Sequence, residues 1–303
     1  MSSAIHVTPC EHEIEFEQLP NFLENNELEI RVDEEATSVF EQINKSVMER
    51  NILCPVCSMK ISKIDSESAT FPLSKQTFPF FVLAPIKVSM HERNNKDAVK
   101  ITTLTLHEVK MANIVNEGTT SDDDGETYRR LSEVANDTIT LISIFGPVAG
   151  RLLSWFPTSW KARVYRKDIE VSERKKLNHF NWVMVNEEGL TVGTFSLSEI
   201  DKKRFSLEES FQSLKLYNVG VCLHSNFHRR GIVSGVAREI FKRISSLKID
   251  IDGFWISTSP ENVGVIRLAE KLDFQFIKTW NDDKKLFPFI KTSLPRNLYW
   301  RTV

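Results

Sequence analysis

Apolar residues recur at helical spacing in the stretch that follows a short basic turn near residue 230. They occupy positions i, i+3, i+4 and i+7 over about four turns, which is the pattern of one buried helix face. The residues are Val233, Val236, Ala237, Ile240, Phe241, Ile244 and Leu247. Because an apolar run at residues 217–225 precedes the turn, the pattern predicts a strand, a turn and a long helix.

The turn itself has the sequence HRRGIVSG, residues 228–235. A strand that enters a helix through such a turn directs free backbone N–H groups and the positive end of the helix dipole at one point. Such a point binds phosphate or pyrophosphate well. The alternative is an ordinary connection with a solvated basic turn, and this stretch alone fits both interpretations.

Period-2 patterns and turn signals predict further strands around this segment. They fall in a hairpin at 180–201, which turns at 186–189, and at 251–259, 274–280 and 297–303. Residues 259–274 predict a second helix, with Ser259 as its N-cap and Pro260 at its first position.

The N-terminal half is patterned less regularly. Residues 1–27 predict a loose acidic arm, and residues 28–32 predict a strand that leads into a helix with Asp33 as its N-cap. The buried face of that helix is Ala36, Val39, Phe40, Ile43 and Val47. Residues 71–90 are expected to be extended, and residues 99–109 predict another strand.

Two further segments are interpreted by exclusion. The acidic run at 116–130 predicts a solvated loop, because the aspartates at 122–124 lack the additional ligands that calcium needs. The apolar segment at 138–160 is interrupted by a Gly-Pro pair, and neither part reaches the ~20 apolar residues of a membrane span. A helix pair is favoured, with membrane-surface or protein contact through 139–160 as the alternative.

Charge and cysteine content narrow the class of protein. The formal net charge of -2 argues against a dedicated nucleic-acid binder. The first residues lack the charged and apolar regions of a secretory signal. Four cysteines in 303 residues do not make a disulfide framework, so a reducing, cytoplasmic location is predicted.

Two of the cysteines form a Cys-x-x-Cys pair, Cys54 and Cys57, around a proline. The pair is similar to half of a zinc knuckle, but zinc takes four ligands and the sequence has no second such pair. Ordinary thiols and no metal are therefore expected. Zinc is the alternative, with Cys54 and Cys57 as candidate ligands that Cys10 and His12 would complete.

From Phe180 onward, the predicted order is hairpin, strand, basic-glycine turn, helix, strand, helix and strand. This order resembles the GNAT superfamily of acetyl-CoA-dependent N-acetyltransferases, above all the branch that acetylates the N-terminal alanine or serine of ribosomal proteins. The matching segments are TVGTFSLSEID at 191–201, NVGVCLHSNFHRRGIVSGVAREIFKRI at 218–244 and SPENVGVIRLAEKLDFQFI at 259–277. A less specific match is LEIRVDEEATSVFEQINKSV at 28–47.

The resemblance implies an α/β (α+β) fold with a central mixed, mostly antiparallel sheet and helices on both faces. It divides the chain into an arm at 1–27, a first strand and helix at 28–51, and an acetyl-CoA-binding core at 176–303. Residues 52–175 would then be an insertion or accessory region between the first helix and the second strand.

Acetyl-CoA is the co-substrate that the resemblance implies. Backbone groups near the end of the fourth strand would hold the pantetheine arm, the turn would hold the pyrophosphate, and an asparagine would lie near the thioester. The implied cofactor-binding residues are Val221, Cys222, Leu223, His228, Arg229, Arg230, Gly231, Ile232, Val233, Ser234, Gly235 and Asn262.

The sequence departs from the family pattern at several of these places. Val233 stands where the family has glycine or alanine, and Asp273 stands in the middle of the Leu-Gly-Phe motif. Val265 and Ala269 stand where family members carry a serine or a tyrosine as the catalytic acid.

The catalytic residue is therefore left open. Glu199, Ser257 and Cys222 are the candidates. Each also has a structural explanation, as a solvated carboxylate, a strand-end hydroxyl and a small core residue, respectively.

Three functions follow from these observations. The first is an N-acetyltransferase that moves acetyl from acetyl-CoA to a primary amine, either a protein N-terminus or a small molecule. The second is a catalytically weak or inactive GNAT-like module that binds CoA or a protein. The third is an interaction protein without a cofactor, anchored to a membrane or complex through the apolar segment.

Overall fold

The computed structural model describes residues 4–15, 18–33, 35, 37–66, 71, 81–92, 95, 97–108, 130, 133–134, 177–202, 205, 207–287 and 290–303. The predictions for residues 122–124 and 139–160 lie outside these residues. Within them, no helix has the length and apolar character needed to cross a membrane. The chain divides into an N-terminal unit, Met1–Ala84 with Glu239–Ile251, and a sheet unit, Pro85–Arg238 with Asp252–Val303.

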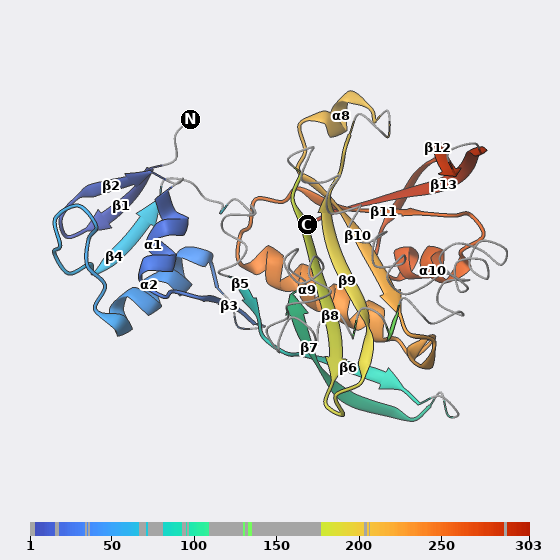
Figure 1. The fold of residues 1–303 in the computed structure, drawn as a ribbon, viewed down its shortest axis with the longest axis horizontal. Coiled ribbons are helices and arrows are strands. Elements are labelled where there is room, and N and C mark those ends of the chain that lie inside the picture. Colours follow the sequence, from blue (N-terminus) through green and yellow to red (C-terminus); the bar gives the residue numbers. More distant parts are fainter. Residues whose placement is uncertain are drawn as a thin grey trace. The chain divides into compact units, whose positions relative to one another are not determined.

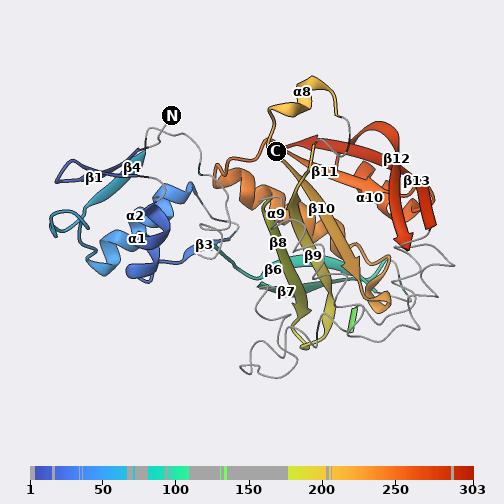
Figure 2. The same ribbon diagram turned by 45° about the horizontal axis from the view of Figure 1, so that its top comes forward.

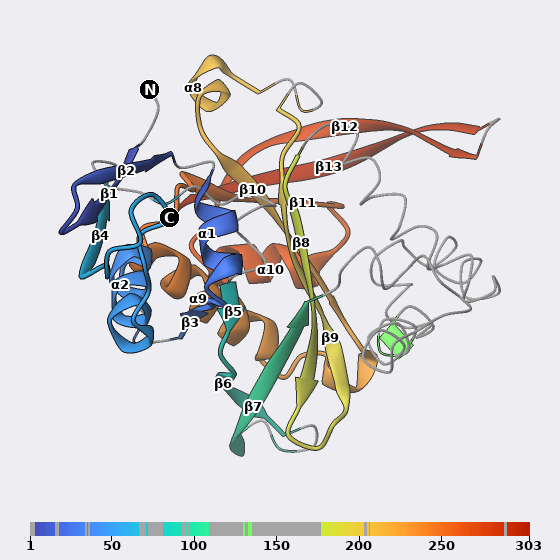
Figure 3. The ribbon, with the colours of Figure 1, turned by 60° about the vertical axis from the view of Figure 1, so that its left-hand side comes forward.

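The N-terminal unit begins with a strand that pairs on both of its edges. β1 (Ala4–Thr8) lies between β2 (His12–Glu15) and β4 (Lys63–Ser66) and is antiparallel to both. Helices α1 (Leu19–Asn25) and α2 (Val39–Arg50) follow, and Figure 3 shows α2 beside β4. Residues 4–25 therefore form two strands and a helix, where the sequence predicted a loose arm.

Helix α2 begins later than the sequence analysis predicted. Its N-cap is Ser38, whose hydroxyl accepts a hydrogen bond from the N–H of Glu41 at 3.3 Å. The Glu41 carboxylate accepts one from the N–H of Ser38 at 3.1 Å, which completes a capping box. The side chain of Thr37 and the backbone of Ser38 bond the same carboxylate and lower the pKa of Glu41. The prediction of Asp33 as the N-cap is wrong, because the Ser-x-x-Glu pattern at 38–41 satisfies more helix N–H groups.

A buried arginine ties a small parallel sheet to helix α9. β3 (Ile30–Val32) pairs in parallel with β5 (Phe81–Leu83). Arg243 of α9 (Ile232–Ser246) is 3% exposed and donates to the carbonyls of Val32 at 3.1 Å and Ala84 at 2.6 Å. The strand predicted at 28–32 is therefore part of this two-stranded sheet.

Among the described residues, the sheet unit contains an eight-stranded sheet in the order β12-β13-β11-β10-β9-β8-β7-β6 (Figure 1). Its strands are β6 (Ile86–His91), β7 (Val99–Glu108), β8 (His179–Asn186), β9 (Thr191–Glu199), β10 (Leu216–Leu223), β11 (Gly253–Thr258), β12 (Gln275–Phe287) and β13 (Ile290–Thr302). In the described part of this eight-stranded sheet, only β10 and β11 pair in parallel. This confirms the predicted mixed, mostly antiparallel sheet.

Two of the hairpins in the sheet can be compared with the sequence predictions. The β8–β9 turn lies at 186–189 as predicted, with Gly189 at φ 75. The β12–β13 hairpin is longer than the two predicted tail strands, and Figure 2 shows it as a twisted ribbon. At the opposite end of the strand order, β6 and β7 fall within residues 52–175 and still pair into the same sheet as β8. The domain boundaries themselves stay a prediction.

The described part of the sheet unit also contains α8 (Glu209–Gln212), the 3₁₀ turn η3 (Ser225–Phe227), the first part of α9, and α10 (Val263–Lys271). α10 begins at Val263, and Asn262 is its N-cap. The prediction of Ser259 as the N-cap and Pro260 as the first helical residue is therefore wrong. A core packs between α8 and the strands around the fully buried Trp255; its members are Ile200, Phe205, Leu207, Leu216, Trp255 and Leu298.

Candidate functional site

The parallel strands β10 and β11 pair over only part of their length. The register runs from Leu216 opposite Gly253 to Asn218 opposite Trp255 and then ends. On its other edge, β10 stays paired with β9 as far as Leu223. Among the described residues, the last part of β10 therefore has a strand partner on one edge only, and its residues are half-buried.

A strand edge of this kind can pair with an extended ligand through main-chain hydrogen bonds. Because β10 and β11 are parallel, their carboxyl ends lie at the same edge of the sheet, where open α/β sheets bind ligands. Val221, Cys222 and Leu223 are at the carboxyl end of β10, and Ser257 and Asn262 are at and after that of β11. The structure thus brings both groups of predicted residues to one edge.

The turn after β10 folds back on the strand. The His224 ring accepts from the N–H of Asn226 at 3.3 Å and caps η3. His228 Nε2 donates to the carbonyl of Leu223 at 2.9 Å. His228 therefore holds the turn against the end of β10, a structural contact that the sequence did not predict.

Two residues of the following turn have a left-handed backbone conformation. Arg229 has φ 61 and Gly231 has φ 81. A left-handed residue between right-handed ones turns successive N–H groups toward one side and forms an anion-binding concavity. Glycine adopts this conformation at little cost, so Gly231 suits the predicted role of a turn residue.

The first turn of α9 presents backbone N–H groups. The N–H of Gly235 donates to Gly231 O at 3.2 Å and starts the helical pattern, and the Ser234 hydroxyl donates to the same carbonyl at 2.8 Å. In the part of the chain that the structure describes, the N–H groups of Ile232, Val233 and Ser234 have no hydrogen-bond acceptor. With the positive end of the helix dipole, they form a site suited to an anion.

The two arginines of the turn differ in their surroundings. Arg229 is exposed. Arg230 Nε donates to the carbonyl of His91 at 2.9 Å, the N–H of His91 donates back to Arg230 O at 3.0 Å, and the guanidinium lies 5.8 Å from the Phe227 ring centroid. Arg230 therefore anchors the turn to β6, and Arg229 is the one with its side chain in solvent.

A pocket of about 270 Å³ lies beside that anchor. It is lined by Met90, Glu92, Lys100, Thr102, Asn186, Glu188, Phe227 and Arg230. None of these residues except Arg230 was predicted as a site residue. His91 and this pocket were missed because β6 is 139 residues from Arg230 along the chain and no local pattern connects them.

Gly235 has a packing role. A Cβ atom on it would lie 2.9 Å from Cγ1 of Val88 on β6. The glycine thus allows α9 to lie directly on the strand. Val233, in the position where the family pattern has glycine or alanine, is half-buried.

Asn262 uses its side chain to cap α10. Its Oδ1 accepts from the N–H of Val265 at 3.3 Å, and its own N–H donates to Ser259 O at 3.0 Å. The predicted contact with a cofactor would have to share this amide group with the cap.

The three candidate catalytic residues lie in different places. Cys222, opposite Thr194, is in the part of β10 beyond the β11 ladder. Ser257 lies two residues after Trp255, the last residue of β11 that pairs with β10, and is itself paired with Leu298 of β13. The Glu199 carboxylate accepts from the N–H and the side-chain amide of Asn178, both at 3.1 Å. Glu199 pairs with Tyr217, four residues before Val221, so at strand spacing it lies about 13 Å along the sheet from that residue.

A protein-family model matches the part of the chain that contains this edge. Residues 130–275, just under half of the chain, match the model described as "Acetyltransferase (GNAT) domain". The matched range includes β8 to β11, α9 and α10, and therefore all the site residues of the sheet unit that were predicted from the sequence. The contacts on β6 and β7 lie outside it. No curated protein matches the chain.

Solved structures similar to this chain include three acetyltransferases. The microcin C7 self-immunity acetyltransferase, solved with acetyl-CoA and AMP, is 14% identical, with 66% of this chain and 92% of that chain covered and a TM-score of 0.43. The Salmonella typhimurium acetyltransferase that modifies the N-terminal serine of ribosomal protein L7/L12 is 12% identical, with coverages of 66% and 95% and a TM-score of 0.44. The Vibrio cholerae spermidine N-acetyltransferase is 12% identical, with coverages of 66% and 95% and a TM-score of 0.40.

Proposed function

We propose that the protein is a GNAT acetyltransferase that transfers acetyl from acetyl-CoA to a primary amine, because residues 130–275 match the model of that family. The observation that carries the proposal is the coincidence of three features in the matched range. They are the early end of the β10–β11 ladder, the left-handed turn at Gly231, and the N–H groups of α9 without a described acceptor.

The cofactor would lie along these features in order. The pantetheine arm would pair with the backbone of Val221, Cys222 and Leu223 in the place of a further strand. The pyrophosphate would accept hydrogen bonds from Ile232, Val233 and Ser234 at the positive end of α9. The exposed Arg229 adds a positive charge near the same turn, whereas His228, Arg230 and Gly235 support its shape.

The chemistry needs an unprotonated amine. Its nitrogen attacks the thioester carbonyl carbon, the C–S bond breaks, and CoA leaves as a thiolate that takes up a proton while the amine loses one. An α-amine with a pKa near ~8 is deprotonated more easily than a lysine near ~10.4. A protein N-terminus therefore fits a site without a strong base better than a lysine side chain does, and a small amine is the other acceptor class we propose.

Cys222 and Ser257 are the proposed candidates for proton transfer, because both lie on the parts of β10 and β11 beyond their shared ladder. Glu199 is the third candidate, and its bonds with Asn178 favour a structural role. The substitutions Ser257→Ala and Cys222→Ala test the first two, each with Ser198→Ala on β9 as the control.

A second function is favoured by a specific observation. Val265 and Ala269 lie on α10 and carry no hydroxyl group, so the helix offers no acid at either family position. The lack of an acid at these two positions fits a module that binds acetyl-CoA but transfers acetyl slowly or not at all. Like the first function, it would place the protein in a reducing, cytoplasmic compartment, where its four free cysteines would persist.

Turnover separates the two functions. Release of the CoA thiol is measured with a colorimetric thiol reagent, using peptides with different N-terminal residues and a panel of polyamines. We expect release above the hydrolysis background with at least one amine class, increasing as pH rises toward the pKa of the amine. Binding of acetyl-CoA without turnover on either panel would favour the inactive module, and absence of binding would contradict both.

A further inference from the structure

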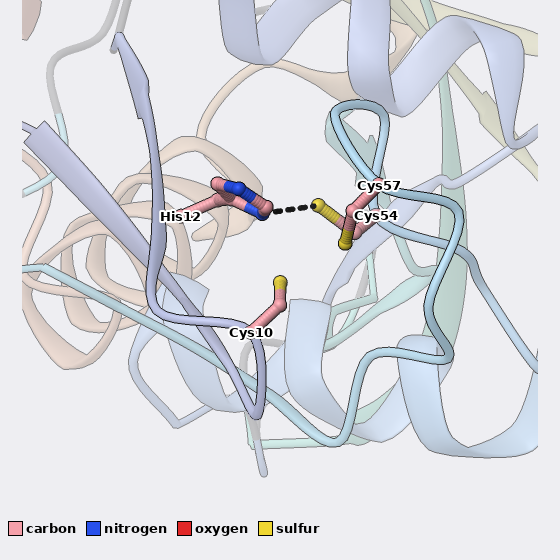
Figure 4. Close-up of side chains that lie close together, drawn as sticks. All are labelled: Cys10, His12, Cys54 and Cys57. Atoms are coloured by element: carbon pink, nitrogen blue, oxygen red, sulfur yellow. Dashed lines mark hydrogen bonds between the residues drawn. The ribbon is translucent and has the colours of Figure 1, made fainter.

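Four potential metal ligands converge in the N-terminal unit (Figure 4). Cys10 and His12 come from the hairpin between β1 and β2, and Cys54 and Cys57 come from the loop between α2 and β4. The ligand atoms of all four lie within 4.8 Å of one another, and Cys54 Sγ is 3.6 Å from His12 Nδ1. Two segments separated by about forty residues thus direct their sulfur and nitrogen atoms at one point.

Main-chain pairing fixes both segments. The hairpin is held by the antiparallel pairs of β1 with β2 and with β4, and Ser62 N donates to Thr8 O at 2.8 Å. In the loop, Cys54 N donates to Met59 O and Ser58 N donates to Cys54 O, both at 2.8 Å. Because the backbone sets these positions, the convergence does not depend on the rotamer of one long side chain.

The loop has the geometry of a metal-binding knuckle. Ser58 takes a left-handed φ of 58, which reverses the chain directly after Cys57. Cys54 is buried, Cys10 is half-buried and Cys57 is exposed, so the three thiols reach from the interior of the unit to its surface.

We propose that Cys10, His12, Cys54 and Cys57 bind one zinc ion. Three thiolates and one imidazole are a ligand set that selects zinc over hard cations, which prefer oxygen. Zn–S bonds of ~2.3 Å and a Zn–N bond of ~2.1 Å place tetrahedral ligand atoms roughly 3.5–3.8 Å apart. The distance between Cys54 and His12 already has this value, and a shift of about 1 Å would bring the widest pair into range.

The ion would be structural. Four protein ligands fill a tetrahedral shell and leave no position for substrate. The ion would tie the β1–β2 hairpin to the loop that leads into β4, and so add a cross-link to a unit with a short three-stranded sheet. Binding free energy from such an ion adds directly to the stability of the fold that holds it.

The sequence supplies a matched control for the first test. The chain has four cysteines, and Cys222 is the one outside the cluster. We expect about one zinc per chain in the full-length protein by mass spectrometry of metals, as for a single closed site. Cys54→Ser and Cys57→Ser should each lower the zinc content at least about fivefold. Cys222→Ser should leave the zinc content unchanged, because only the cluster thiols are proposed as ligands.

A second measurement avoids variants that fail to fold. Metal-free wild-type protein is titrated with Co²⁺, and we expect the visible absorption of tetrahedral, thiolate-bound cobalt to saturate at one equivalent and to disappear when Zn²⁺ is added. Removing the metal should also increase hydrogen exchange in β1, β2 and β4 and leave β8 and β9, the internal reference, unchanged.

Two results would overturn the proposal. One is wild-type protein that holds no zinc as isolated and gives no cobalt spectrum under reducing conditions. The other is a Cys54–Cys57 disulfide found by peptide mapping of the freshly isolated protein, because a disulfide would take two of the four ligands.

Discussion

At the N-terminus of α9, Val233 stands where the family pattern has a glycine or an alanine. Its N–H group has no acceptor among the described residues, and its side chain is half-buried. A branched side chain there restricts how closely an anion can approach the backbone, but it does not remove the N–H groups that bind the anion. The residue therefore tunes affinity in the proposed site without removing the site.

A charge at this position tests the proposed pyrophosphate site. We expect Val233→Glu to weaken acetyl-CoA binding about tenfold or more, because the carboxylate repels the pyrophosphate and competes for the same N–H groups. The helix should keep its stability, since an acidic residue in the first turn favours the helix dipole.

Val233→Gln is the matched control, because it has the same size and no charge. Calorimetric titration of both variants with acetyl-CoA measures the difference. Equal affinity of the two variants would place the pyrophosphate away from this helix end.

Local sequence patterns did not identify the N-caps of two helices. Gly231 takes a left-handed φ of 81, which glycine adopts at little cost, and its role in binding a cofactor stays a prediction. Asp33 and Ser259 were predicted as N-caps, whereas Ser38 and Asn262 are the observed ones, and all four residues are of types that commonly cap helices. Only the hydrogen bonds decide between neighbouring candidates, and the Ser-x-x-Glu spacing at 38–41 was the available clue.

At the scale of elements, α9 depends on close contact with β6. A Cβ atom at Gly235 would meet Cγ1 of Val88 at 2.9 Å and Cβ of the same residue at 3.1 Å. These distances are too short for carbon atoms, so the helix or the strand has to move. The same contact positions the turn that carries the proposed pyrophosphate site.

Two glycine-to-alanine substitutions separate packing from helix propensity. Gly235→Ala should destabilise the sheet unit by about 1–3 kcal/mol through overpacking. Gly264 is at an exposed position of α10, and a Cβ atom on it would have Asn262 Oδ1 as its nearest neighbour, at 3.6 Å. Gly264→Ala should therefore stabilise the sheet unit by up to about 1 kcal/mol. Urea unfolding followed by tryptophan fluorescence measures both, and the same sign for both variants would contradict the packing role.

The strands and helices around the site could be predicted from the sequence, because each has a clear period and a turn signal. The hairpin at 180–201, the strand before residue 224 and the helix from Ile232 are examples. Strand pairing could not be predicted in the same way. β6 and β7 join β8 across more than seventy residues, and no local pattern encodes such a contact.

At the scale of the molecule, two sites lie in separate units. The proposed acetyl-CoA site is in the sheet unit, and the proposed zinc site is in the N-terminal unit. Zinc was the less favoured hypothesis from the sequence, because zinc takes four ligands and the sequence has no second Cys-x-x-Cys pair. The β1–β2 hairpin brings Cys10 and His12 to the loop, which required tertiary structure to see.

The central claim is that the edge formed by β10, β11 and α9 binds acetyl-CoA. Isothermal titration of the full-length protein with acetyl-CoA tests it most directly. We predict one site per chain with a Kd between about 1 μM and 1 mM, weakened about tenfold or more in Val233→Glu and retained in Val233→Gln. Absence of binding at millimolar acetyl-CoA to folded wild-type protein would contradict the claim.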